Sequence, residues 1–437
     1  MNILRLQPVA RHRLAIGLMC AVLAVAAMPT ITRNFRGASI ADDFAPVYRA
    51  AQAMRDGQDI YTATKGLYIY PPFLALFFQP LTLVPERVAA IVWAVLSALL
   101  FGFSAVLIAR EVTQHWLSSK VAADLSTAWV IATIAILLVC EKIHADLRLG
   151  QTDCLVLLGF ACVLKWMERK PWLAGAAVGA TASMKYLSLI FVPYFILKRN
   201  YKAAIASIAW FIFFNIIPAV EVGIRGATQF AMSALRALVK MVEQPTEKDG
   251  AKIPSVIWER SVSITSAITR VTRANQLPDW VAAGIILGCF VVLAAAVFFI
   301  SQRAGILLFR PSGSQPGERS GAIKSLEWSS VIVFALAFSP QTTARHYVLM
   351  SAVFVVAAAL LFIERQPPRR WILVTAMVLT SIGISFPPQQ IGINEALRTW
   401  RAFAGPSVCA VALLLVVLAI GGRAAASVWR AYNSSDH

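Results

Sequence analysis

Two adjacent carboxylates, Asp42 and Asp43, stand in the first long polar interval of the chain, directly after an apolar N-terminal segment. An amphipathic run follows them, then a turn sequence at Gly57–Asp59 and the pair Pro71-Pro72. The apolar run after the prolines, residues 73–84, is too short to cross a bilayer upright. An acid pair beside a membrane segment predicts a site at the boundary between water and lipid. The alternative is a solvated loop between two spans, whose acids only maintain solubility.

Cationic and polar side chains inside or beside later apolar runs are the second chemical feature of the sequence. A charge at membrane depth costs about 2.5–3.5 kcal/mol even on the insertion scale, so such residues usually face a cavity or a partner. Arg148 and Lys142 have the alternative of extending to the membrane surface. Lys185 interrupts a long uncharged stretch, which favours a functional role. His346 alone fits a core histidine, but next to Arg345 it is a candidate anion contact.

The sequence lacks the usual signatures of nucleotide, metal and disulfide chemistry. It has no phosphate-binding glycine loop and no HExxH, and its five histidines never fall two within one helical turn. None of the six cysteines forms a CxxC pair, so they are predicted to be small core residues. We therefore expect no metal and no cofactor. One acid with cations nearby suits group transfer from a phosphorylated lipid, in which the acid accepts a hydroxyl proton and the cations hold the departing phosphate.

Composition predicts a membrane protein. The chain has 437 residues, of which 58% are apolar and only 14% charged, against about 25% in soluble domains. The net charge of +18 does not indicate nucleic-acid binding, because Lys and Arg fall in short clusters between apolar runs. We expect an all-α polytopic bundle forming one domain over residues 1–437, with about twelve transmembrane helices near 14–28, 88–109, 121–140, 151–166, 171–184, 186–197, 203–221, 280–301, 328–344, 346–363, 371–386 and 404–421.

The distribution of positive charge predicts the orientation of this bundle. Short loops rich in Lys and Arg remain on the cytoplasmic side, which places both termini inside. The two long loops, about 31–87 and 222–279, are then extracytoplasmic. Apolar residues at near-helical spacing in the second loop, from Phe230 to Val242, predict an amphipathic helix that lies on the membrane surface or on the protein itself.

Several short motifs, in order along the chain, resemble glycosyltransferase family 87. The first-loop signature is carried by Asp43-Phe44, Tyr48, Ala50-Ala51, Gly57 to Tyr61, Tyr70-Pro71-Pro72 and Pro80-Leu81. Later matches are Gly150-Gln151, Ala174-Gly175 with Lys185, and Ser339-Pro340 with His346-Tyr347. Members of this family are integral membrane enzymes of the GT-C fold that use polyprenyl-phosphate sugars, with mannosyltransferases as the known type.

The resemblance implies roles for individual residues. Asp43 falls on the family's first-loop aspartate, which implies a general base, although adjacent Asp42 leaves that assignment open by one residue. Lys185 and His346 fall on implied contacts to the lipid phosphate or the sugar. The expected substrate-binding set is Asp42, Tyr48, Tyr70, Arg148, Gln151, Lys185, Arg345 and His346. The segment Gln341 to Arg345 lacks the aromatic residue that the family carries before this histidine, which leaves the sugar open.

The sequence thus predicts an inverting hexosyltransferase, most simply a mannosyltransferase, in a bacterial inner membrane with its active site outside. Its partners would be a polyprenyl-phosphate sugar donor, a lipid or glycan acceptor and the bilayer, but no nucleic acid. A secondary transporter or flippase for a lipid-linked or anionic solute is the alternative, since it would also place Asp, Lys and His around a cavity. A non-catalytic membrane assembly partner would leave Asp43, Lys185 and His346 unexplained.

Overall fold

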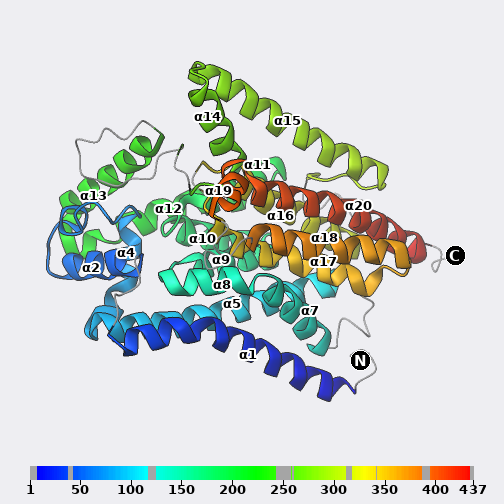
Figure 1. Cartoon of the computed structure of the whole chain (residues 1–437), viewed down its shortest axis with the longest axis horizontal. Helices are drawn as coiled ribbons and strands as arrows, with labels where there is room; N and C mark the ends of the chain where they lie inside the picture. Colours follow the sequence, from blue (N-terminus) through cyan, green and yellow to red (C-terminus); the bar gives the residue numbers. More distant parts are fainter. Residues whose placement is uncertain are drawn as a thin grey trace.

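The protein is built from helices that run along one another in a long bundle (Figure 1). The computed structural model describes residues 7–37, 43–116, 125–242, 257, 260–311, 317–340, 342–385 and 394–433. Within these residues there is no strand, only one isolated bridge between Ser261 and Thr343. The all-α prediction is therefore confirmed for the described part of the chain.

The helices of the first half, in chain order, are α1 (Pro8–Phe35), α2 (Phe44–Arg55), α3 (Ile60–Ala63), α4 (Pro72–Phe78), η2 (Gln79–Leu83), α5 (Glu86–Trp116), α7 (Leu125–Leu138), α8 (Cys140–Leu149), α9 (Asp153–Trp166), α10 (Pro171–Ala182), η3 (Tyr186–Ile190), α11 (Phe191–Leu197) and α12 (Tyr201–Ile216). Those of the second half are α13 (Ala219–Val242), α14 (Ile264–Ala274), α15 (Asp279–Arg303), α16 (Gly317–Phe338), η5 (Ala344–Met350), α17 (Ser351–Ile363), α18 (Pro367–Ser385), α19 (Asn394–Ala402) and α20 (Gly405–Asn433).

Local sequence signals mark several helix ends. Asp59 caps the start of α3 by accepting hydrogen bonds from the backbone N–H groups of Tyr61 and Thr62. Asn200 caps α12 by accepting one from the backbone N–H of Ala203. Ser263 caps α14 through its hydroxyl. Pro171 begins α10, where its missing N–H costs nothing.

Six helical segments of the described chain are long and apolar enough to span a membrane, namely α1, α5, α15, α16, η5 with α17, and α20. Two bent pairs raise the number to as many as eight: α7 with α8, bent by 68°, and α12 with α13, bent by 104°. The other four expected spans fall on α9, α10, η3 with α11, and α18. None of these belongs to the six candidate spans or the two bent pairs. The chain is thus a multi-pass membrane protein, whereas the predicted number of twelve spans stays a prediction.

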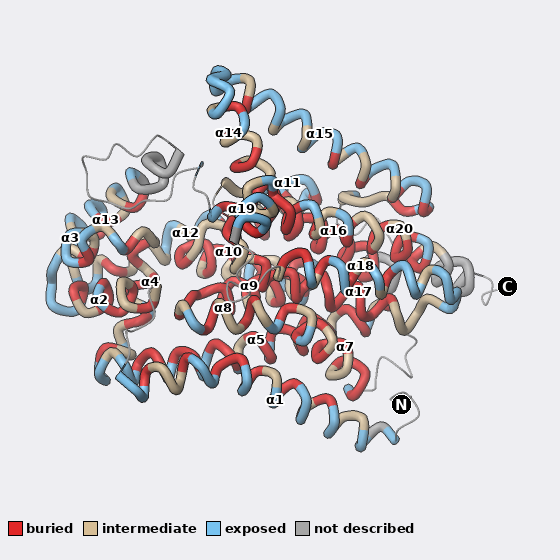
Figure 2. Tube along the Cα trace, viewed as in Figure 1, coloured by how far each residue is buried: buried red, intermediate tan, exposed pale blue. Residues whose placement is uncertain are grey.

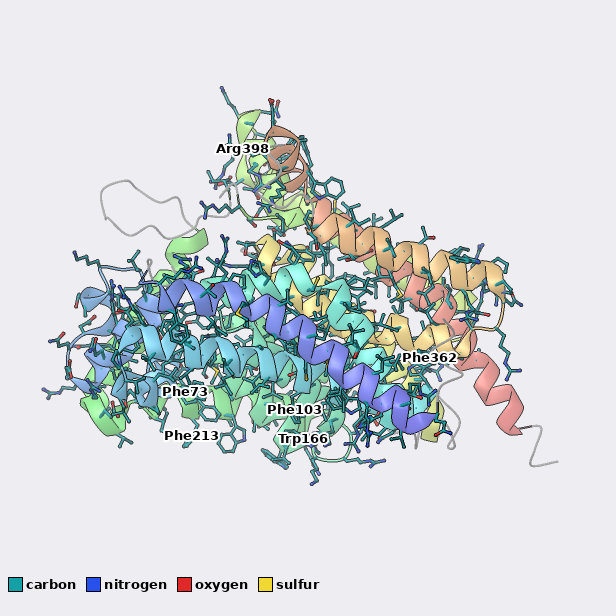
Figure 3. All side chains as sticks on the ribbon, turned by 60° about the horizontal axis from the view of Figure 1, so that its bottom comes forward. Phe73, Phe103, Trp166, Phe213, Phe362 and Arg398 are labelled. Carbon is teal, nitrogen blue, oxygen red and sulfur yellow. The ribbon has the colours of Figure 1, made fainter. Side chains whose placement is uncertain are left out.

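The centre of the bundle is η5 with α17. Every residue from Tyr347 to Leu360 is buried, and α17 packs against α5, α7, α16, α18 and α20 (Figure 2). By contrast, only 11% of the α15 span is buried. Figure 1 shows α14 and α15 set apart from the main bundle, along one side of it. Arg270 of α14 donates to the carbonyl of Ala402 in α19, 2.7 Å away, and Figure 3 shows these helices adjacent at the end that carries Arg398.

The first predicted loop folds into a compact cap of α2, α3, α4 and η2. The predicted amphipathic helix is part of α13, which packs on α2, α3 and α4. Phe230 of α13 is buried, and its ring lies 6.1 Å from that of Tyr61, centroid to centroid. This side of α13 therefore packs on the protein itself, which is one of the two positions predicted for the amphipathic helix.

Small residues allow α10 and α12 to approach closely. A Cβ atom added at Gly179 would lie 2.6 Å from both the backbone nitrogen of Phe211 and the Cβ of Trp210, so a side chain there would push the helices apart. Gly288 of α15 is also helical, but it has nothing within 4 Å of such an atom.

Gly179→Ala should therefore destabilise the protein, although the same change at Gly288 should not. Both substitutions gain about 1 kcal/mol of helix propensity, so their difference isolates the clash. We expect the thermal midpoint of detergent-solubilised Gly179→Ala to lie about 2–5 °C below that of Gly288→Ala, the effect of overpacking by about 1–3 kcal/mol. Equal midpoints for the two variants would contradict this packing.

Candidate functional site

The site begins at the tight turn between α8 and α9. Gly150 ends α8 in the left-handed conformation, with φ of 68°, and the N–H of Gln151 donates back to the carbonyl of Asp146. A Cβ atom at Gly150 would lie 2.6 Å from the Cβ of Phe44. The backbone N–H of Asp43 donates to the carbonyl of Leu149, 3.2 Å away. This glycine therefore lets the start of α2 rest directly on the turn.

At this contact the carboxylate of Asp43 accepts two short hydrogen bonds. Gln151 Nε2 and Arg345 Nη1 each lie 2.6 Å from Asp43 Oδ2. The side chain of Asp43 is 32% exposed, so the carboxylate remains open on one side. The carbonyl of Gln151 accepts from the indole N–H of Trp93, which fixes the turn against α5. An acid held by one amide and one cation, yet open to solvent, can still accept a proton from a bound hydroxyl.

A second acid, Asp153, pairs with Lys185 and lies near His346. Lys185, in the break between α10 and η3, places Nζ 2.5 Å from Oδ1 of Asp153, which is fully buried at the start of α9. His346 Nε2 lies 4.0 Å from the other oxygen, Oδ2. The backbone N–H of Thr343 donates to His346 Nδ1 at 3.0 Å. Since Nδ1 acts as an acceptor, the neutral ring carries its proton on Nε2, toward Asp153.

These two groups of side chains form one cluster because their elements are shared. Gln151 lies in the turn that leads into α9 and Asp153 is the first residue of that helix, while Arg345 and His346 are consecutive in η5. The fold thus brings together six side chains from distant parts of the sequence. We name them the acid–cation cluster: Asp43, Gln151, Asp153, Lys185, Arg345 and His346.

Tyr70 also borders the acid–cation cluster. Its phenol lies within electrostatic range of Asp43 and Arg345. Burial raises the pKa of Tyr70 above its ordinary value of 10, and the nearby charge of Asp43 raises it further. The phenol therefore stays neutral and can donate a hydrogen bond across the range in which enzymes work.

Other predicted site residues lie elsewhere. The hydroxyl of Tyr48 donates to the carbonyl of Val84 at 2.8 Å and the side chain is buried, so it joins α2 to the end of η2. Arg148 is exposed on α8, and none of the cluster's hydrogen bonds involves it. Lys142 does not extend outward, since it is buried and pairs with Glu141 at 2.6 Å. Asp42 lies outside the described residues.

Two acids of the site were missed by sequence reasoning. Neither Asp146 nor Asp153 is among the site residues predicted from the sequence. Both side chains are fully buried, and they lie close enough for their charges to interact. Both oxygens of Asp146 lack any donor among the described residues. A usable signal existed, because Asp153 opens an apolar run and an acid there needs a cationic partner such as Lys185.

Among the described residues, no three His, Cys, Asp or Glu side chains are arranged to hold a metal ion. What the cluster offers is a partly open carboxylate beside two fixed cations, an imidazole and a phenol. This set can hold an anion and remove a proton near it.

Comparisons with known proteins agree with this chemistry. The sequence model of glycosyltransferase family 87 matches residues 68–311, more than half of the chain. This range includes Gln151, Asp153 and Lys185, but neither Asp43 nor His346.

Curated relatives match over more of the chain. A polyprenol-phosphate-mannose-dependent alpha-(1-2)-phosphatidylinositol mannoside mannosyltransferase of Mycolicibacterium smegmatis is 24% identical over 85% of this chain and 82% of its own length. Its counterpart of the same name in Mycobacterium tuberculosis is 25% identical over 84% and 82%. An alpha-(1->3)-arabinofuranosyltransferase of Mycolicibacterium smegmatis is 30% identical over 40% of this chain and 41% of its own. No solved structure matches. The chain therefore belongs to glycosyltransferase family 87, a family of membrane enzymes that transfer sugars.

Proposed function

We propose that the protein transfers a hexose, mannose, from a polyprenyl-phosphate donor to a hydroxyl group of a lipid or glycan acceptor, with inversion at the anomeric carbon. The observation that carries this proposal is the acid–cation cluster, which places the accessible carboxylate of Asp43 on Arg345 and the buried carboxylate of Asp153 on Lys185 and near His346. The names of the two longest-matching relatives support mannose and a glycolipid acceptor. The arabinofuranosyltransferase match supports the same kind of chemistry with a different sugar.

In this mechanism Asp43 acts as the general base. Its carboxylate accepts the proton of the acceptor hydroxyl while that oxygen attacks the anomeric carbon. The bond from the anomeric carbon to the phosphate oxygen breaks, and its electron pair leaves with the polyprenyl phosphate. Because the leaving group is already a phosphate anion, the step needs no protonated acid to assist departure. The neighbouring cations lower the barrier by stabilising the charge that moves onto this phosphate.

Arg345 links donor binding to the base. In the free protein its guanidinium lies 2.6 Å from Asp43 and compensates its charge. A donor phosphate competes for the same guanidinium, because Arg forms charge-assisted bonds with phosphate as readily as with carboxylate. Binding of the donor would thus weaken the hold on Asp43 and leave the carboxylate able to accept a proton. We infer that donor binds before acceptor.

The topology proposed from the charge pattern is a GT-C bundle of about twelve spans in a bacterial inner membrane, both termini cytoplasmic and the active site outside. Its support from the fold is that Asp43 and the first-loop cap pack at the same end of the bundle as Lys185 and η5. A transporter or flippase would share the bent helix pairs, since broken helices often line transport sites. Membership in a family of transferases favours the enzyme.

Asp43→Asn should reduce sugar transfer by about 10²- to 10⁴-fold, because the amide keeps the size of the side chain but cannot accept the proton. Transfer from radiolabelled polyprenyl-phosphate mannose to native membrane lipid measures this, with donor binding largely kept. Asp59→Asn, which alters only the cap of α3, is the matched control and should stay active. Asp42→Asn should also have a small effect, and near-full turnover of Asp43→Asn would disprove the assignment.

Replacement of Lys185 needs a paired design, because Lys185→Met alone would leave Asp153 as an unpaired buried charge. Lys185→Met with Asp153→Asn removes both charges. We expect this double variant to fold but to bind polyprenyl phosphate about 10- to 100-fold more weakly, the effect of losing a charge-assisted contact. The control is Lys198→Met with Glu327→Gln, a buried ion pair with 3.0 Å between Nζ and Oε2, joining α11 to α16. Equal donor affinity in both double variants would make Lys185 a purely structural residue.

Asp146 and Asp153 should behave differently when each is changed to Asn. A buried carboxylate needs a donor or a cation, and Asp153 has Lys185 whereas neither oxygen of Asp146 has a donor among the described residues, so we expect the proton on Asp146. Asp146→Asn keeps this position neutral and should keep transfer within about 3-fold of wild type, whereas Asp153→Asn frees Lys185 and should lose at least about 10-fold. Melting curves exclude unfolding as the cause. An Asp146→Asn variant as inactive as Asp153→Asn would refute this arrangement.

A further inference from the structure

A cavity of about 360 Å³ lies at the other end of the bundle from the acid–cation cluster. Helix α9 connects the two sites, because it begins at Asp153 in the cluster and ends at Trp166 in the cavity wall. At 1.5 Å per residue the two ends of α9 are about 20 Å apart. The cavity is therefore separate from the site proposed for sugar transfer.

The lining of this cavity is strongly cationic. Four of its residues are exposed cations, namely Arg110, Lys165, Arg169 and Lys170. Within the described part of the chain, none of these four side chains forms an ion pair.

The one carboxylate in the wall does not offset these charges. Oε1 of Glu111 is 3.6 Å from Nζ of Lys324 and 3.5 Å from Nε2 of His115, so this carboxylate is already paired outside the four cations. Lys170 also precedes the first residue of α10, a 12-residue helix whose N-terminus has no side-chain cap. The positive end of that helix adds to the field of the cations. The cavity thus favours an anion.

The position of the cavity indicates what kind of anion would bind. Arg110 and Glu111 lie near the C-terminal end of the spanning helix α5, and Leu107 and Trp166 add apolar surface to the wall. Figure 3 shows Trp166 at the edge of the bundle. Tryptophan at a helix end marks the level of lipid head groups, and basic pockets between such ends bind anionic head groups. Cations that only orient the chain have no need to share one cavity.

We propose that this cavity binds the phosphate of an anionic phospholipid head group. The four cations and the N-terminus of α10 would hold the phosphate, while Leu107 and Trp166 would contact the first atoms of the acyl chains. Bound lipid would then hold the ends of α5, α9 and α10 together at this membrane surface.

Native mass spectrometry of the full chain in detergent, titrated with phosphatidylglycerol or phosphatidylcholine, tests this proposal. Wild type should bind phosphatidylglycerol preferentially, and Lys165→Gln with Arg169→Gln should weaken that binding at least about 10-fold, as loss of two charge-assisted contacts requires. The control, Lys202→Gln with Arg370→Gln, removes the same charge from exposed residues that do not line the cavity. Because all four replaced side chains are exposed, each variant should fold, which its melting curve verifies.

Three outcomes would overturn the proposal. Equal loss of phosphatidylglycerol in both double variants would show only a general attraction to surface charge. Equal binding of phosphatidylcholine and phosphatidylglycerol would show that the cavity does not select an anionic head group. Displacement of phosphatidylglycerol by millimolar inorganic phosphate alone would assign the cavity to free phosphate.

Discussion

The ion pair between Asp43 and Arg345 is the constraint on which the rest of the site depends, since it joins residues 302 positions apart in the sequence. It forms only if α2 begins on the turn after α8 and if η5 reaches the same point from the centre of the bundle. Gly150 makes the first condition possible through its left-handed conformation and the absence of a side chain against Phe44. The buried position of η5 provides the second. Gln151 then completes the contact by bonding the same carboxylate oxygen.

Much of the chemistry could be predicted from residue types alone. Asp43, Lys185, Arg345 and His346 are recognisable because charged groups beside apolar runs are costly and must have a use or a partner. The pairing of Lys185 with Asp153 could not be predicted in the same way, because it depends on the packing of α9 against the break between α10 and η3. Tyr48 illustrates the opposite error. An aromatic residue in a signature can serve the substrate or the fold, and here its hydroxyl is used by the backbone of Val84.

The helices could be placed from hydropathy, but not all of them could be identified as spans. The twelve apolar segments all overlap described helices, yet α9, α10 and α11 are short, and α9 is almost wholly buried among its neighbours. A core helix and a short membrane span have the same apolar composition, so sequence cannot separate them. The sequence also does not predict the bend of 68° between α7 and α8, because there is neither Pro nor Gly at the break, at positions 139 and 140. Packing of α8 against η5 and α1 accounts for it instead.

The central claim is that the donor phosphate takes Arg345 from Asp43 and thereby prepares the base. A cryo-electron microscopy structure of the full chain with a non-reactive polyprenyl-phosphonate mannose analogue tests this directly. The account predicts the phosphonate within hydrogen-bond distance of Arg345 and Lys185, and the Asp43 carboxylate released from Arg345 and facing the anomeric carbon. A phosphonate bound away from both cations, or an anomeric carbon on the far side of the cluster from Asp43, would contradict it.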